Sequence, residues 1–395
     1  MRIVVGLSGG VDSSVAAALL QEQGHEVIGM YMRNWHDETV TVDNACPWID
    51  DANDAMLVAS HLGIPYQVID LSDAYKQRIV DVMFAEYAAG RTPNPDILCN
   101  REIKFDIFLE AALDLGAEAV ATGHYCQKGE IQTEHGTVYR LLAGADANKD
   151  QSYFLCQLNQ DQIRQALFPI GHLQKAEVRK IAKRLGLPTA EKKDSQGLCF
   201  VGKVKLPVFL QQQLQVKIGP IVEIPADHPQ FAAAQSLRKT NPLRDAISHS
   251  WQPTDGDLVG EHPGAHFFTI GQRKGLHVGG KADPLFVIGR DMETNTLYVG
   301  QREDHPGLLK SCLRMKASDM HWLRPDCHET FKINHSAQFQ ARFRYRQPLR
   351  DVTLVQAEDG FVYMQFSSPQ MGVAAGQYAA WYDENECIGS GIISD

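Results

Sequence analysis

Short apolar runs alternate with amphipathic segments over the first half of the chain. Residues 3–7, 27–32, 66–69 and 119–122 have the length and composition of buried strands. Apolar residues recur at helical spacing in the segments 15–20, 50–61, 74–89, 102–115 and 176–187. Because strands and helices alternate, the pattern predicts an α/β fold with a parallel, doubly wound sheet.

The pattern changes after residue 200. Residues 203–285 mix a glutamine-rich helical segment with short apolar runs and many Gly and Pro, and from about 286 short alternating strands predict an antiparallel β-barrel. We therefore expect three domains, over 1–200, 201–285 and 286–395. The stretch 225–253 has no clear periodicity and is predicted to be a surface insertion in the central domain.

A glycine-rich turn joins the first strand to the first helix. It consists of Gly6, Leu7, Ser8, Gly9, Gly10, Val11, Asp12 and Ser13. Glycines let the main chain approach an anion closely, and the N–H groups of a helix N-terminus attract phosphate. The lysine that ends a Walker A loop is absent. The turn instead resembles the loop of the ATP pyrophosphatases, which cleave ATP between the α and β phosphates; an ordinary strand–turn–helix connection is the alternative.

Composition restricts the class of protein. The chain has 395 residues, 44% hydrophobic and 22% charged, which is ordinary for a globular protein of two or three domains. Its net charge of −10 opposes indiscriminate binding to nucleic acid, so we expect no DNA partner, although a local basic cluster can still bind RNA. We find no apolar run that could span a bilayer and no targeting segment, and expect a cytoplasmic protein.

Two of the eight cysteines stand in contexts that favour a thiolate. Cys99 follows a proline-containing loop just before a predicted helix, and a helix N-terminus lowers a thiol pKa. Cys199 lies in a glycine-containing loop after Lys192 and Lys193, whose charges would have the same effect. The spacing alone leaves open that both are buried structural cysteines. No Cys-x-x-Cys pair occurs, which argues against a zinc ribbon.

Basic residues gather in the predicted barrel. Between Lys332 and Arg350 there is no Asp or Glu, and Arg342, Arg344 and Arg346 alternate as they would on one face of a strand. Such a face can bind phosphates. A solvated strand face would show the same pattern.

Taken together, the motifs resemble those of the tRNA-specific 2-thiouridylases, the MnmA family, which place sulfur on the wobble uridine of certain tRNAs. The resemblance spans nearly the whole chain in the family's order. It rests on residues 6–13, 30–35, 92–100, 123–125, 149–155, 197–200, 269–276, 344–347 and 376–377. Two departures concern the central domain: residues 225–253 are longer than we expect, and residues 281–286 lack an aromatic pair.

The resemblance implies a mechanism. ATP, with Mg²⁺ near Asp12, would adenylate the C2 oxygen of the uridine in tRNAs for Lys, Glu and Gln. Cys199 would carry a persulfide received from an upstream sulfur donor, and transfer would leave a Cys99–Cys199 disulfide. Asp96 would act as acid or base beside Cys99. The two cysteine loops must then approach each other although they are 100 positions apart.

The resemblance also implies binding residues. ATP would contact Met32 and Gly123 in addition to the loop. For tRNA, the implied contacts are Asn94, Pro95 and Asp96 around an everted base, together with His124, Lys149, Asp150, Gln151, Arg344, Tyr345 and Gln377.

Two other functions remain open on the sequence. One is an amide-forming synthetase that also adenylates its substrate, which needs the loop but no cysteine pair. The other is a non-catalytic RNA-binding protein that keeps a nucleotide-binding fold, which would release no pyrophosphate.

Overall fold

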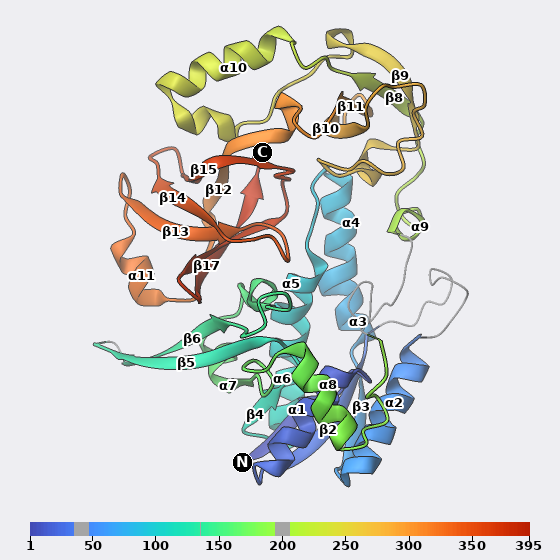
Figure 1. Ribbon diagram of the computed structural model, residues 1–395, viewed down its shortest axis with the longest axis vertical. Coiled ribbons are helices and arrows are strands. Elements are labelled where there is room, and N and C mark those ends of the chain that lie inside the picture. Colours follow the sequence, from blue (N-terminus) through green and yellow to red (C-terminus); the bar gives the residue numbers. More distant parts are fainter. Residues whose placement is uncertain (35–46, 135, 194–205) are drawn as a thin grey trace.

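The computed structural model describes residues 1–34, 47–134, 136–193 and 206–395. It confirms the expected fold class: a parallel-sheet α/β domain comes first, a small central domain follows, and an antiparallel barrel ends the chain (Figure 1). Among the described helices, none has the length and apolar character needed to cross a membrane.

The first domain is built on a five-stranded sheet in the order β3-β2-β1-β4-β7, with all four pairings parallel. Its strands are β1 (Arg2–Gly6), β2 (Glu26–Arg33), β3 (Tyr66–Asp70), β4 (Ala119–Ala121) and β7 (Ala166–Leu167). Because the strands run in one direction, their carboxyl ends meet at one edge, where ligands of such sheets bind.

Helices cover both faces of this sheet, as a doubly wound fold requires. On one face, Ile3 and Val5 of β1 pack with α1 (Val11–Glu22) and α2 (Pro47–Leu62), and α8 (Lys175–Arg184) packs on α1. On the other face, Val4 belongs to a cluster formed with a chain of short helical segments. These are α3 (Ser72–Tyr75), the π-helix η3 (Lys76–Val80), α4 (Asp81–Ala88), α5 (Pro95–Cys99), the π-helix η4 (Asn100–Ile107) and α6 (Phe108–Asp114).

The central domain has a four-stranded sheet in the order β10-β11-β8-β9. The strands are β8 (Gly219–Glu223), β9 (Asp257–His262), β10 (Leu285–Asp291) and β11 (Thr296–Gln301). Since β11 pairs with β8, residues 286–301 lie in the central sheet, whereas we expected the barrel domain to begin at 286. The stretch 225–253 contains the helix α10 (Pro229–Thr240), none of whose residues is buried, and this explains why no periodicity marks it.

The barrel is closed by a pairing between its first and last strands, β12 and β17. Around it the order is β12 (Leu309–Trp322), β15 (Phe361–Met371), β14 (Arg350–Gln356), β13 (Ser336–Arg342), β16 (Tyr378–Asp383) and β17 (Glu386–Ser394). The first two residues of β17, Glu386 and Cys387, also pair with β6 (Gly136–Ala143), which forms a hairpin with β5 (Cys126–Thr133) of the first domain. The first domain and the barrel therefore share one continuous sheet (Figure 1).

The connections carry a few short helices. These are η5 (Ser152–Leu155), α7 (Gln160–Gln165), α9 (Leu206–Leu210), η6 (Pro242–Ala246), η7 (Pro253–Asp255), η8 (Ala265–Phe267), η9 (Pro306–Leu308) and α11 (Pro325–Thr330). The ring of Phe209 in α9 stacks on that of Phe84 in α4, with centroids 5.4 Å apart, which anchors the start of the central domain to the first.

Candidate active site

The glycine-rich loop lies at the carboxyl end of β1 and is held by its own hydroxyl groups. The Ser8 amide donates to Ser13 Oγ at 3.1 Å, and Ser14 Oγ donates to the Gly10 carbonyl at 2.8 Å. Gly9 has a φ of 69°, and a Cβ there would lie 2.2 Å from the carbonyl oxygen of Asp51 in α2. Only glycine fits at this position, so the loop is fixed against α2 before any ligand arrives.

The residues predicted to bind ATP meet at this edge of the sheet. A Cβ on Gly123 would lie 2.6 Å from the Ser13 amide nitrogen, and Met32 Cε lies 3.7 Å from the Cβ position of Gly6. Two residues beyond Met32, the Asn34 side chain is 1% exposed, and within the described structure neither its amide nitrogen nor its amide oxygen has a hydrogen-bond partner. A buried amide without a partner fits a site that receives a polar ligand such as a nucleotide.

Asp12 is bound by two residues that sequence reasoning did not assign to the site. Lys175 Nζ lies 2.8 Å from each Asp12 carboxylate oxygen, and the Tyr125 hydroxyl donates to Oδ1 at 2.7 Å. Lys175 is the first residue of α8, and its amide donates to Asp146 Oδ2 at 2.9 Å, which fixes the start of the helix. The positive charge that the loop lacks in its own sequence is therefore supplied from α8.

The same geometry bears on the predicted Mg²⁺. Within the described ranges, no group of three or more His, Cys, Asp and Glu side chains is arranged to hold a metal ion. Asp12 is a single carboxylate beside a phosphate-type loop. Mg²⁺ commonly uses one or two carboxylates together with substrate phosphates, so Asp12 fits this role once one of its oxygens parts from Lys175.

Cys99 is the last residue of the one-turn helix α5. The Asn94 side chain caps this helix by accepting from the Ile97 amide at 3.2 Å, and Pro95 occupies its first position. We expected Cys99 to precede a helix, but the helix begins at Pro95 because this cap and proline start it earlier. The thiol is 0% exposed and lies in the apolar cluster that also contains Met32.

Cys199 lies outside the described residues, so the predicted approach of its sulfur to Cys99 stays a prediction. The chain is described up to Lys193. Lys192 Nζ contacts Asp51 Oδ1 at 2.7 Å and Asp54 Oδ2 at 2.5 Å. The Lys192 charge that we expected to favour a Cys199 thiolate is therefore paired with carboxylates of α2.

Two residues assigned to tRNA by resemblance have inward-facing side chains. Asp150 is 4% exposed and forms an ion pair with Arg342 of the barrel at 2.9 Å. His124 is 8% exposed, and its Nδ1 lies 2.7 Å from Thr122 Oγ1; burial, with the nearby Lys104 charge, lowers its pKa well below the usual value. Their contacts with tRNA remain predictions, and neither side chain lies on the surface in this structure.

Gln151 and Lys149 flank Asp150. The Tyr125 amide donates to Gln151 Oε1 at 3.0 Å, and the Gln151 amide donates to the Tyr125 carbonyl at 2.9 Å. Gln151 therefore contacts Tyr125, the residue whose hydroxyl donates to Asp12. This segment adjoins the nucleotide edge of the sheet.

The expectation of three arginines on one strand face is wrong. β13 ends at Arg342, whose guanidinium is buried and lies 4.9 Å from the Tyr382 ring centroid. The next residues form a turn in which Arg346 has a φ of 62°. Arg344 is exposed there and donates to the Gly372 carbonyl at 2.6 Å, while the Tyr345 ring lies 4.5 Å from that of Phe154.

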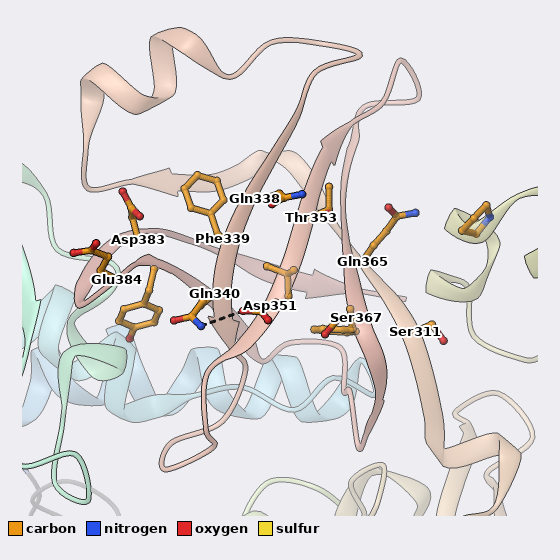
Figure 2. Close-up of a pocket in the computed structure, with 14 residues that line it drawn as sticks. Ser311, Gln338, Phe339, Gln340, Asp351, Thr353, Gln365, Ser367, Asp383 and Glu384 are labelled. Carbon is orange, nitrogen blue, oxygen red and sulfur yellow. Dashed lines mark hydrogen bonds between the residues drawn. The ribbon is translucent and has the colours of Figure 1, made fainter.

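A groove of about 700 Å³ lies elsewhere, on the outer face of the barrel (Figure 2). Gln338, Gln340 and Thr353 line it together with Asp351, which accepts from Gln340 Nε2 at 3.0 Å. Asp383 and Glu384 add further negative charge, which would repel phosphates. None of the predicted site residues lines this groove, so it is not the predicted nucleotide site.

Comparison with known proteins covers the chain in three segments. Residues 1–203 match the family described as tRNA methyl transferase HUP domain. Residues 248–301 match the tRNA methyl transferase PRC-barrel domain, and residues 313–393 match the aminomethyltransferase beta-barrel domain.

Three relatives that align over nearly their whole length carry the same name. The chain is 58% identical to the tRNA-specific 2-thiouridylase MnmA of Flavobacterium johnsoniae and 56% identical to that of Christiangramia forsetii, in both cases over 100% of both chains. It is 44% identical to the enzyme of the same name from Karelsulcia muelleri, over 100% of this chain and 98% of that one. This chain therefore belongs to the tRNA-specific 2-thiouridylase (MnmA) family.

Proposed function

We propose that this protein is a cytoplasmic tRNA-uridine 2-sulfurtransferase that uses ATP to thiolate the wobble uridine of tRNAs for Lys, Glu and Gln. Family membership supports the reaction class. The structural observation that carries the proposal is the joint placement of the glycine-rich loop, Gly123 and the Asp12–Lys175 pair at one edge of the sheet.

The loop and its neighbours have the chemistry that adenylation requires. A uridine C2 oxygen leaves badly, and bound ATP would turn it into part of a good leaving group, AMP. Amide groups at the start of α1 would bind the departing pyrophosphate, and Lys175 would neutralise the charge that develops there. Asp12 would keep the Lys175 ammonium in position through one oxygen and, with the other released from that ammonium, would hold Mg²⁺.

The sulfur step uses the cysteine pair. An upstream donor would transfer sulfur to Cys199 and form a persulfide. Asp96 would act as acid or base toward the Cys99 thiol. The Cys99 thiolate would attack the Cys199 sulfur, forming a disulfide and releasing hydrosulfide, which adds at C2 as AMP departs. Alternatively, the terminal persulfide sulfur adds at C2 first. In both routes a thiol reductant must restore the two cysteines.

Mass analysis of tRNA nucleosides, with pyrophosphate release measured in parallel, tests this proposal. With ATP, tRNA and a persulfide source, wild type should form 2-thiouridine derivatives. Cys199→Ser should release pyrophosphate but form no thiolated nucleoside, because adenylation does not need the thiol. Cys327→Ser, which alters a half-buried barrel cysteine, is the matched control and should behave as wild type.

The other outcomes separate the alternatives. Thiolated product from Cys199→Ser would refute the persulfide role. ATP-dependent adenylation of another substrate that survives loss of both Cys99 and Cys199 would indicate an amide-forming synthetase. A wild-type protein that binds tRNA and never releases pyrophosphate would be an RNA-binding protein.

A further inference from the structure

Thr92 is a point at which all three domains meet. Its amide donates to the carbonyl of Ala375 in the barrel at 2.8 Å. Its hydroxyl contacts two residues of the central domain, Thr269 Oγ1 at 3.3 Å and the Arg290 guanidinium at 3.2 Å. Thr92 is buried and stands two residues before Asn94, the cap of the helix that ends in Cys99.

Gln377 of the barrel binds the same segment. Its Nε2 donates to the carbonyl oxygens of Thr92 at 2.8 Å and Pro93 at 3.0 Å, and its Oε1 lies 3.5 Å from Asn94 Nδ2. A primary amide has two N–H donors, and both are used here by main-chain carbonyls. The family resemblance assigns this side chain to tRNA, but in this structure its donors hold the protein.

The backbone beside Gln377 approaches this segment closely. Gly376 has a φ of 89°, and a Cβ there would lie 2.9 Å from both the nitrogen and the oxygen of Thr92. Two independent features, an amide that spans three residues and a glycine that permits contact, thus bring the barrel onto residues 92–94. Residues 92–94, which lead into α5, are therefore held by another domain.

We infer that Gln377 is a positioning residue: from the barrel, it fixes residues 92–94 and so the helix that places Cys99. The inference rests on the proposed function only in giving Cys99 a catalytic task. It predicts that losing the Gln377 amide loosens α5 even in protein without tRNA, whereas a residue that only contacts tRNA would leave α5 unchanged.

Alkylation of Cys99 in tRNA-free protein tests this inference. The thiol is fully buried, so its reaction with iodoacetamide, followed by peptide mass spectrometry, reports local opening. Gln377→Ala should speed Cys99 alkylation about tenfold or more, since two hydrogen bonds are lost. Buried Cys312 of the barrel is the internal reference and should not change. Gln338→Ala, on the barrel's outer groove, is the matched control variant.

The same variant is then assayed with tRNA. A positioning role lowers kcat for thiolation and leaves tRNA affinity within about twofold of wild type, because the residue makes no decisive RNA contact. Unchanged Cys99 alkylation in Gln377→Ala with weakened tRNA binding would overturn the inference. If Gln377→Ala speeds Cys99 alkylation but the wild-type protein never thiolates tRNA, the proposed function is wrong and the positioning role of Gln377 still holds.

A second variant is needed in case Gln377→Ala unfolds the barrel. If Cys312 also reacts faster in Gln377→Ala, the barrel has opened, and Thr92→Val then decides. That change removes the hydroxyl contacts with Thr269 and Arg290 and leaves the barrel's side chains intact. Faster alkylation of Cys99 alone supports the junction as the control on α5, and an unchanged rate contradicts it.

Discussion

At the scale of single residues, Lys175 brings to the glycine-rich loop a positive charge that the loop's own sequence lacks, and it does so by pairing with Asp12. Lys175→Met should lower tRNA-dependent pyrophosphate release by about 100-fold, a loss typical of removing one group that stabilises developing charge. The folded protein should tolerate the change, because the Asp12 side chain is 30% exposed and water can therefore reach its carboxylate. Steady-state pyrophosphate release and tRNA affinity are the two measurements, and only the first should change.

Lys183→Met is the matched control for that prediction. Lys183 lies on the same helix, is exposed and pairs with Glu191 at 2.9 Å, away from the loop. It should release pyrophosphate as wild type does, and Lys175→Arg should retain part of the activity because the charge is kept. A Lys175→Met protein with wild-type turnover would remove this residue from the nucleotide site.

At the scale of elements, the turn after β13 is the candidate RNA-binding feature of the barrel. Arg344 is exposed in this turn, and the adjacent Tyr345 packs on Phe154 of the first domain. Arg344→Ala should weaken tRNA binding and reduce the slope of log affinity against log salt by about one, the change expected for one lost phosphate contact. Binding is measured by titration between 50 and 200 mM salt, about the range over which such contacts are resolved.

Arg350→Ala provides the comparison for Arg344. Arg350 is also exposed, at the start of β14, so the two variants remove the same charge from neighbouring elements. We expect the larger change in affinity and slope from Arg344→Ala. Equal effects would mean that general charge, and not this turn, governs tRNA binding.

The elements also show what the sequence could and could not predict. Strand and helix periodicity predicted the doubly wound sheet and the barrel, because each face buries its own apolar residues. Periodicity also predicted a strand through Arg346. A turn that gives Arg346 a positive φ, and a carboxylate 192 positions away from Arg342, leave no local signal.

Contacts between distant residues were likewise not predictable at the candidate active site. The loop was evident because its glycines and hydroxyls are contiguous, whereas Lys175 meets Asp12 across 163 positions. The boundary expected at 286 differs from the strand pairing for a related reason. β10 and β11 look like barrel strands, and only the pairing of β11 with β8 joins this hairpin to the central sheet. Contacts between distant segments are therefore what the structure adds.

At the scale of the whole molecule, buried and half-buried histidines should make the fold sensitive to acid. Burial is the largest cause that lowers the pKa of six of them below 6.5: His124, His249, His262, His266, His305 and His321. They are distributed over all three domains. As the pH falls through 6.5 the unfolded chain binds more protons at these positions than the folded chain does, so stability falls as the pH decreases.

The linkage between proton binding and folding sets the size of this loss of stability. A buried histidine such as His124 removes at most about 1.4 kcal/mol of unfolding free energy per pH unit below 6.5. The thermal midpoint should therefore be lower at pH 5.5 than at pH 7.5, roughly one unit on either side of that value. His321→Gln should narrow the difference between the two midpoints, because glutamine can still donate to the Leu158 carbonyl but takes up no proton. Substitution of the exposed His335 by Gln should leave the difference unchanged.

Carboxylates such as Asp326, whose pKa is lowered by Arg324, titrate below this pH window and cannot produce the change. A midpoint that rises on acidification would show that the buried rings accept protons in the folded state.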